Sequence, residues 1–182
     1  TAVRTGGPGH AGISLIVVDK GTPGFTVDRS LRKMGWHCSD TAELSYVDVR
    51  VPASNLVGEE NSGFYQIAEQ FVVERIGLAV HAYGIASRSL ALTAAYARER
   101  ETFGKPLIAN QVVRHKLVEM HRRVEAARTY TRELAARHAA GDHVIATDCL
   151  AKQTALEACD HVADQPVHQR GRDRYTVRAK GD

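Results

Sequence analysis

The sequence predicts an α+β fold in which a partial antiparallel β domain is followed by an up-down bundle of long helices. Strand-like segments occupy residues 1–57, and helical periodicity dominates residues 58–165. Because the two kinds of segment do not alternate, they predict segregated layers rather than a parallel α/β sheet. With 182 residues, 43% of them hydrophobic and 25% charged, the chain has the composition of a globular protein.

The first 57 residues have the composition of strands. The run GISLIVVD is rich in β-branched residues, FTVD follows a GTPG turn, and TAELSYVDVRVP alternates polar and apolar residues before Pro52 ends it. The alternation changes phase between Tyr46 and Val47, which predicts a bulge or a change of covering partner. TGGPGHAG is predicted to be a loop. No helix follows its glycines, so a dinucleotide-binding phosphate loop is not predicted.

Three helices are predicted after VGEENSGF. The first begins after Asn61 or Ser62, either of which can cap it, and runs to about Arg100, roughly 60 Å at 1.5 Å per residue. The second follows Pro106 and ends at Gly141, and the third lies within VIATDCLAKQTALEACDHVAD. Three helices leave one face of a four-helix bundle open. The core-facing residues are predicted to be Val113, Leu117, Met120, Val124, Ala127 and Leu134 on the second helix, and Ala151, Ala155, Ala158 and Val162 on the third.

Charge and cysteine usage exclude several classes of function. The net charge of +3 arises within residues 166–182, which hold five basic and two acidic side chains, so no nucleic-acid-binding stripe is predicted. No apolar run approaches the roughly 20 residues of a membrane span. The odd cysteine count without CxxC spacing predicts a reducing compartment, and the absence of HxxH or HExxH pairs argues against a metal site.

Glu74 is an unexpected residue on the first predicted helix. A rotation of 100° per residue places it within an apolar stripe about 60° wide. A buried carboxylate must find a partner or raise its pKa, and a raised pKa beside a cavity suits proton abstraction next to a carbonyl. Alternatively, Glu74 pairs with a basic residue and only fixes helix packing. Arg75 points about 100° away, so it could instead reach a ligand phosphate or brace a loop. The other members of the stripe are Ile67, Phe71, Leu78, Ile85 and Leu92.

The junction ARERETFGKPLIANQ, residues 97–111, joins the first two helices. It combines Arg100, Phe103 and Gln111 at a bend where an ordinary connection needs only Gly and Pro. We therefore expect this bend to grip a cofactor.

The chain resembles part of a flavin-dependent acyl-CoA dehydrogenase. The matching pieces are GISLIVVDKGTPGF, MGWHCSDTAELSYVDVRVPASNLVGEENSGF, ERIGLAVHAYGIA, YARERETFGKPLIANQ and HKLVEM, which together cover residues 11 to about 165. Their order is that of the family's middle β domain running into its C-terminal helical domain. The family's N-terminal helical domain and its glycine-rich QxxGGxG segment have no counterpart. The resemblance therefore implies a fragment, whose ability to bind FAD or turn over alone is in question.

The resemblance implies FAD-dependent α,β-dehydrogenation of an acyl-CoA thioester to trans-2-enoyl-CoA. A glutamate takes the α proton while the β carbon passes a hydride to FAD. Glu74 matches the base of one group of members, which includes isovaleryl-CoA and long-chain enzymes. Another group places the base after the QxxGGxG segment, and this alternative stays open. Val72, Val73 and Arg75 match substrate-binding positions, Arg75 beside the CoA portion.

The resemblance also implies how the cofactor is held. Arg100 matches an arginine that reaches the FAD pyrophosphate of a neighbouring subunit, for which a guanidinium fork is suited. Phe103 and Gln111 match residues at the adenine end, and Asn110 is also expected to bind the cofactor. A homotetramer built from dimers follows, with electron-transfer flavoprotein as acceptor. The alternatives are an acyl-CoA oxidase or flavin monooxygenase on the same fold, or a non-catalytic helical assembly module.

Residues 166–182 depart from the family pattern. Pro166 is expected to interrupt the third helix, and the basic tail beyond it has no apolar periodicity. We hypothesise that this tail is an out-of-frame reading of a GC-rich gene, an idea that fails if no adjacent frame encodes a GGxG segment after Gln165. The Ala- and Arg-rich composition predicts a bacterial cytoplasmic protein, and a eukaryotic origin would imply the mitochondrial matrix.

Overall fold

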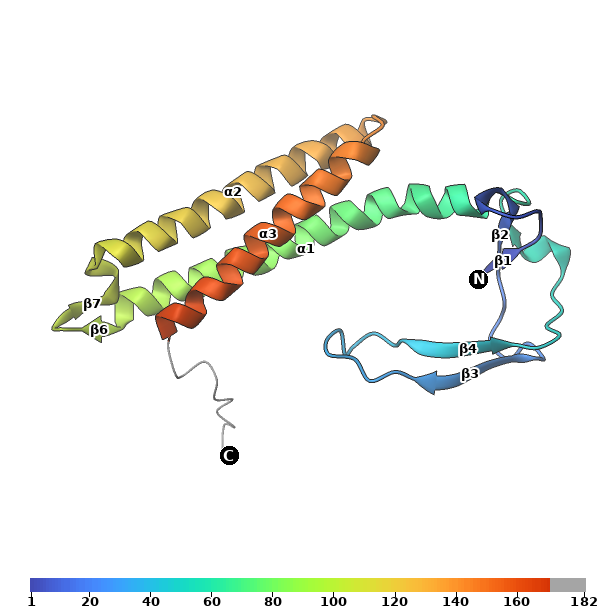
Figure 1. The fold of residues 1–182 in the computed structure, drawn as a ribbon, viewed down its shortest axis with the longest axis horizontal. Coiled ribbons are helices and arrows are strands. Elements are labelled where there is room, and N and C mark those ends of the chain that lie inside the picture. The colour runs from blue at the N-terminus through green and yellow to red at the C-terminus, as the bar shows by residue number, and fades with distance from the viewer. Residues whose placement is uncertain (171–182) are drawn as a thin grey trace. The chain divides into compact units, whose positions relative to one another are not determined.

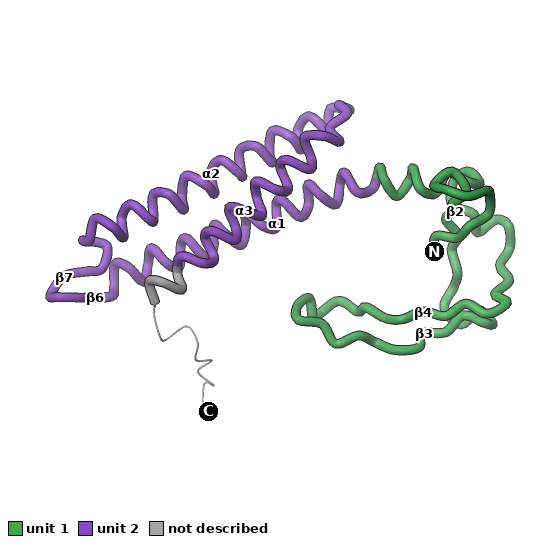
Figure 2. Tube along the Cα trace, viewed as in Figure 1, with its two compact units in different colours: residues 1–69 green, residues 70–182 purple. Residues whose placement is uncertain are grey.

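The computed structural model describes residues 1–170 and contains strands followed by long helices (Figure 1). The chain divides into two compact units, Thr1–Glu69 and Gln70–Asp182 (Figure 2). The predicted α+β class is confirmed. The last strand of the first unit ends at Val57, and the boundary between the units falls inside the first helix.

The first unit contains two small antiparallel sheets. One has the strand order β1-β2-β5, formed by β1 (Ala2–Arg4), β2 (Ile13–Ile16) and β5 (Leu56–Val57). The other pairs β3 (Phe25–Ser30) with β4 (Ala42–Tyr46). Short 3-10 helices, His10–Gly12 and Ala53–Asn55, precede β2 and β5.

The predicted strand in TAELSYVDVRVP is shorter than its alternation indicates. The strand β4 ends at Tyr46, and the register shift lies in β3, between Val27 and Arg29, rather than at Tyr46 and Val47. Asp48 has a φ of 50°, a left-handed conformation that turns the chain. The change of phase therefore marks the end of the strand and not a bulge.

The loop before the first helix is anchored on β2. The buried Ser14 hydroxyl accepts a hydrogen bond from the Asn61 backbone N–H at 2.7 Å. Thr5 donates to the Asn61 side-chain oxygen at 2.8 Å. A Cβ on Gly63 would lie 2.8 Å from the Ser14 carbonyl carbon, so only glycine lets the helix start this close to the strand.

The helices are α1 (Gly63–Glu99), α2 (Gln111–Ala139) and α3 (Ile145–Arg170). The α1 helix has 37 residues, about 56 Å at 1.5 Å per residue. A hairpin of β6 (Glu101–Thr102) and β7 (Lys105–Pro106), then the 3-10 helix Leu107–Ala109, connects α1 to α2.

The expected helix break at Pro166 is wrong, because α3 continues as far as Arg170. A proline removes one backbone donor from the ladder, and neighbouring bonds can carry a helix past it. The remainder of the predicted basic tail, 171–182, lies outside the described residues.

Small side chains bring the three helices together. Ala79 and Ala82 of α1 form one core cluster with Ala127 of α2 and with Ala155 and Ala158 of α3. Alanine lets helix backbones approach closely because it fills little space between them. Of the predicted core-facing residues, Met120, Val124, Ala127, Leu134, Ala151, Ala155, Ala158 and Val162 are buried, whereas Val113 and Leu117 are half-buried.

Candidate functional site

Glu74 lies on an exposed face of α1, not in the buried position that its apolar neighbours predict. Phe71 and Leu78 on the same stripe are 45% and 41% exposed, and Ile85 and Leu92 are 44% and 43% exposed. Within the described part of the chain, no side chain makes a hydrogen bond or ion pair with Glu74. Glu74 is exposed because α1 turns its alanine face to α2 and α3, so the large side chains remain on another face.

The two valines before Glu74 point in different directions. Val72 is 6% exposed and packs in a core cluster with Leu134, Val144 and Ala151, while Val73 is 49% exposed. Consecutive helix residues are rotated by about 100°, so Val72 faces the core cluster while Val73 faces outward. Their expected role in binding substrate stays a prediction.

Arg75 forms an ion pair with a residue that the sequence analysis did not single out. Its Nη1 lies 3.1 Å from Oδ2 of Asp148, in the first turn of α3. Asp148 has no exposed surface, and Arg75 is 29% exposed in its side chain. The Arg75 guanidinium also lies 5.8 Å from the centre of the Phe71 ring. Hydrogen bonding to Asp148 raises the pKa of Arg75, which keeps the guanidinium charged.

The spacing of residues on α3 predicts that Asp148 is buried. It lies three residues before Ala151 and seven before Ala155, so it continues the narrow apolar face of α3. An acid on an apolar face is the feature that marked Glu74. The burial of Asp148 therefore could have been predicted, and its partner could not, because the pair joins residues 73 positions apart.

The cofactor residues expected from the junction gather on the β6–β7 hairpin and the start of α2. Thr102 pairs with Lys105, which leaves Phe103 and Gly104 as a two-residue turn with φ of 52° and 75°. Both positive angles match a type I′ turn. The backbone carbonyl of Arg100 accepts from the Leu107 N–H at 2.7 Å and closes the hairpin at its base.

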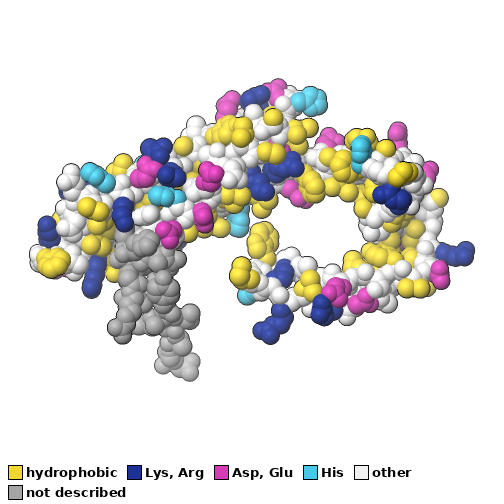
Figure 3. Space-filling view, viewed as in Figure 1, with side chains coloured by type: hydrophobic (Ala, Val, Ile, Leu, Met, Phe, Trp, Pro, Cys, Tyr) yellow, Lys and Arg dark blue, Asp and Glu magenta, His cyan; other side chains and the backbone are white. Residues whose placement is uncertain are grey.

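Phe103 is fully exposed, at 102% of its reference surface, and a hydrophobic side chain stands at the end of the hairpin in Figure 3. A bulky aromatic residue in a left-handed conformation is an outlier, because its Cβ crowds the backbone. The turn thus holds a strained, exposed ring where a polar residue would be more stable. Such strain is typical of a residue that contacts a ligand.

The hairpin and the start of α2 fit a dinucleotide with phosphates and an aromatic base. Arg100 is exposed, and its side chain has no hydrogen-bond or ion-pair partner among the residues the structure describes. Asn110 stands at the N-cap of α2 without capping it through its side chain, which instead donates to the Leu107 carbonyl at 3.2 Å. Gln111 is exposed in the first turn, where free N–H groups favour anions. The residues that could hold FAD are therefore Arg100, Phe103, Asn110 and Gln111.

The two groups of candidate residues lie apart: Glu74 is within α1, and the cofactor residues begin at Arg100, just after α1 ends. Glu74 and Arg100 are separated by 26 positions, which corresponds to about 39 Å at 1.5 Å per residue. Figure 1 shows the β6–β7 hairpin at the C-terminal end of α1. A single cofactor could not bridge this distance within one chain.

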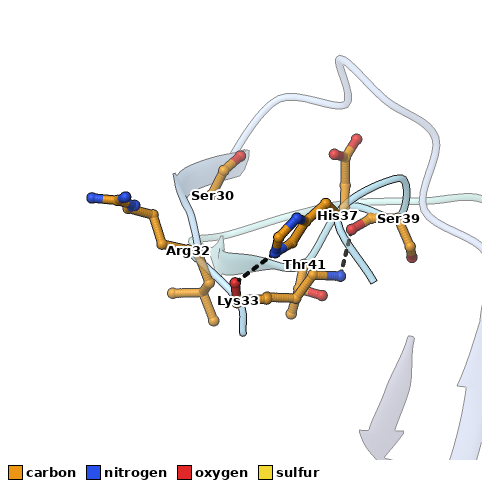
Figure 4. A pocket seen from close by; sticks show the side chains of 8 residues that line it. Ser30, Arg32, Lys33, His37, Ser39 and Thr41 are labelled. Atoms are coloured by element: carbon orange, nitrogen blue, oxygen red, sulfur yellow. Dashed lines mark hydrogen bonds between the residues drawn. The ribbon is translucent and has the colours of Figure 1, made fainter. Parts of the chain in front are cut away.

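A pocket of about 340 Å³ occurs in the loop between β3 and β4, away from the residues discussed above in the sequence (Figure 4). Lys33 Nζ donates to the Ser39 carbonyl at 2.5 Å, and His37 Nε2 lies 3.1 Å from the Lys33 carbonyl. These bonds close the loop on itself. None of the predicted site residues lines this pocket.

Neither a membrane-spanning helix nor a metal-binding cluster occurs among the described residues. No helix among residues 1–170 is long and apolar enough to cross a membrane. The same residues contain no cluster of three or more His, Cys, Asp or Glu side chains arranged for a metal ion.

Comparisons with known proteins agree on one family. Residues 61–180 match the model of the acyl-CoA dehydrogenase C-terminal domain. An acyl-CoA dehydrogenase from Bacillus subtilis is 41% identical over 150 residues, which are 82% of this chain and 40% of that protein. The chain thus spans about two fifths of the length of the curated relatives it matches.

Solved structures give the same picture. A probable acyl-CoA dehydrogenase from Mycobacterium abscessus is 59% identical with a TM-score of 0.91, and the match covers 97% of this chain and 47% of that one. Butyryl-CoA dehydrogenase from Megasphaera elsdenii is 37% identical with a TM-score of 0.87, and the match covers 92% and 44% of the two chains.

Proposed function

Because the chain belongs to the acyl-CoA dehydrogenase family, we propose that it contributes to the FAD-dependent α,β-dehydrogenation of an acyl-CoA thioester. The product is a trans-2-enoyl-CoA. The chain supplies part of a middle β domain (1–57) and part of a C-terminal helical domain (58–165). The FAD expected from the sequence is the cofactor of this family.

Glu74 is the proposed base that removes the α proton. The observation that carries this role is a carboxylate without a partner among the described residues, set in an apolar stripe that the chain leaves exposed. Covering that stripe with an acyl chain removes water from around the Glu74 carboxylate and brings the α carbon of the substrate next to it, as general-base catalysis requires. Bound FAD accepts the hydride from the β carbon. Val72, Val73 and Arg75 are proposed to shape the substrate site.

The β6–β7 hairpin is proposed to hold the FAD of a neighbouring subunit. Its distance of about 39 Å along α1 from Glu74 supports this division, because one FAD cannot contact both places in one chain. Arg100 binds the pyrophosphate, Phe103 flanks the adenine, and Asn110 and Gln111 provide polar contacts. A cofactor shared in this way requires an oligomer, and we propose a homotetramer built from dimers.

The remaining partners follow from the reaction. Each turnover would transfer two electrons from the substrate to the bound flavin, and we propose electron-transfer flavoprotein as the acceptor that reoxidises it. The location is proposed to be the bacterial cytoplasm, or the mitochondrial matrix for a eukaryotic source.

The test is anaerobic flavin reduction by the purified protein after incubation with FAD. We expect a panel of straight and branched acyl-CoA substrates to contain at least one that bleaches the visible absorbance of bound flavin and yields an enoyl-CoA by mass spectrometry. Bound flavin that no acyl-CoA reduces would contradict the proposal. In air, dye reduction without peroxide indicates a dehydrogenase, whereas stoichiometric peroxide indicates an oxidase. A well-folded oligomer that takes up no FAD would favour an assembly module.

A further inference from the structure

Among the described residues, Asp148 is the charged side chain with no exposed surface. It lies in the first turn of α3, where its backbone N–H donates to the Val144 carbonyl at 2.8 Å. The core cluster of Val72, Leu134, Val144 and Ala151 surrounds this end of the helix. A carboxylate in such a place needs a partner, because burial without one is very costly.

Arg75 is that partner, and it is held from two sides. Its Nη1 donates to Asp148 Oδ2 at 3.1 Å, and its guanidinium lies 5.8 Å from the centre of the Phe71 ring, one turn earlier on α1. The side chain remains 29% exposed. The guanidinium is therefore fixed in direction while part of it stays accessible.

The geometry of the pair is not that of an ion pair built for stability alone. Asp148 Oδ1 is buried and has no hydrogen-bond partner within the described structure. A buried pair stabilises a fold only when its remaining lone pairs are satisfied. A guanidinium carries five N–H donors, and the contact with Asp148 uses one of them. The pair thus leaves most donors of a fixed cation free for another acceptor.

We propose that Asp148 is a positioning residue, which holds Arg75 so that its remaining donors meet a phosphate of the coenzyme thioester. Asp148 itself touches no substrate. The inference rests on the proposed function, because that function supplies the phosphate-bearing ligand. It adds a residue on α3 to a substrate site otherwise located on α1.

The test compares the affinity for coenzyme A with thermal stability in the same variants. Isothermal titration with coenzyme A and thermal unfolding are measured for Asp148→Asn, which keeps the shape of the side chain and removes its charge. We expect the Kd to rise about tenfold, as for the loss of a charge-assisted contact. The matched control is Asp142→Asn, because Asp142 forms an exposed ion pair with Arg137 at the same 3.1 Å. We expect no change in its Kd.

A double variant separates positioning from folding. Arg75→Gln with Asp148→Asn leaves no unpaired charge in the core, so its Tm is expected to return toward that of the wild type. Its Kd for coenzyme A is expected to stay weak, because the cation is gone. A Tm that falls in Asp148→Asn while the Kd is unchanged would show a purely structural role and overturn the inference.

Two further outcomes are informative. Should Asp148→Asn fail to fold, Arg75→Lys tests the same contact, since lysine keeps the charge and lacks the planar fork. A weaker Kd at nearly unchanged Tm supports the inference, and an unchanged Kd opposes it.

If the wild-type protein does not bind coenzyme A while retaining FAD, the proposed substrate is wrong and this inference falls with it. Normal binding that is insensitive to Asp148 removes only the inference.

Discussion

The two ends of α1 place their candidate residues in different ways. At the hairpin end, Arg100 and Phe103 stand fully outside the core, and Phe103 is 102% exposed on a strained turn. Near the other end, Glu74 and Arg75 are adjacent in sequence but serve different surfaces, one exposed and one joined to a buried acid. The geometry of the hairpin is determined locally, by a short sequence motif. The exposure of Glu74 and Arg75 depends instead on which elements pack against α1.

The largest expected effect is at Glu74. Replacing Glu74 by Gln removes the base and leaves the shape, so turnover should fall about 10²- to 10⁴-fold. FAD content should be unchanged, since the hairpin is about 39 Å away along α1. Dye-coupled turnover and the flavin-to-protein ratio measure both quantities. The control is Glu69→Gln, an exposed glutamate on the same helix. Equal turnover of the Glu74 variant and the wild type would place the base elsewhere, such as in a glycine-rich C-terminal segment.

The second effect is at the opposite end of the helix. Arg100→Ala should weaken FAD binding about 10- to 100-fold, because a charge-assisted contact with phosphate is lost. Arg98→Ala is a matched control, since Arg98 is exposed in the last turn of α1. Equilibrium titration of apoprotein with FAD gives both affinities. Comparable losses in the two variants would mean that general positive charge, rather than the position of Arg100, binds the cofactor.

Phe103 allows strain and binding to be separated. Asparagine tolerates the left-handed conformation, so Phe103→Asn should keep the hairpin and slightly raise the Tm. Loss of the ring should weaken FAD binding about fivefold to tenfold, the low end for stacking on an aromatic base. Thermal unfolding and FAD titration report the two effects. An affinity that improves in this variant would indicate that the strained ring obstructs the site.

The smallest effect concerns Glu119. Unlike Glu74, this glutamate forms ion pairs, with Arg122 and Arg123 on the same helix. Hydrogen bonds from Arg122 and Arg123 lower the pKa of Glu119 from 4.5 to about 2. A lowered pKa stabilises the fold above pH 4.5, and this contribution is lost as the pH falls from 4.5 toward 2. Because the Glu119 side chain is 37% exposed, salt screens its ion pairs and the contribution is small.

The Tm of Glu119→Gln should therefore be slightly lower than that of the wild type at pH 7, and the two Tm values should be equal at pH 2. Thermal unfolding at the two values in low salt provides the measurement. A difference that persists at pH 2 would assign the effect to shape rather than charge.

Local features could be predicted well from the sequence, whereas the packing of one helix face against other helices could not. The motif at Arg100, Phe103 and Gln111 lies within 12 residues, so short-range bonds determine its geometry. Periodicity also found the buried alanine face of α3. It could not decide which apolar face of α1 is covered, because both faces carry helical spacing. Nor could it find the contact from Arg75 to Asp148, which depends on how α1 and α3 pack.

Errors at element ends have a similar origin. Alternation continued past Tyr46 although the strand ends there, since a single residue with positive φ, Asp48, redirects the chain. Proline was expected to end α3 at residue 166, and the helix runs to Arg170. In both cases the hydrogen bonding of the neighbouring residues decides where the element ends, and sequence patterns do not reveal that bonding.

The central claim is that one helix serves two separate sites, with proton abstraction at Glu74 and cofactor binding at Arg100. The most direct measurement is anaerobic flavin reduction by acyl-CoA in Glu74→Gln and Arg100→Ala, each at low and at saturating FAD. We predict that Glu74→Gln keeps its flavin and is not reduced at either concentration. Arg100→Ala should lack flavin at low FAD and recover reduction at saturation. Reduction in Glu74→Gln, or no recovery in Arg100→Ala, would contradict the account.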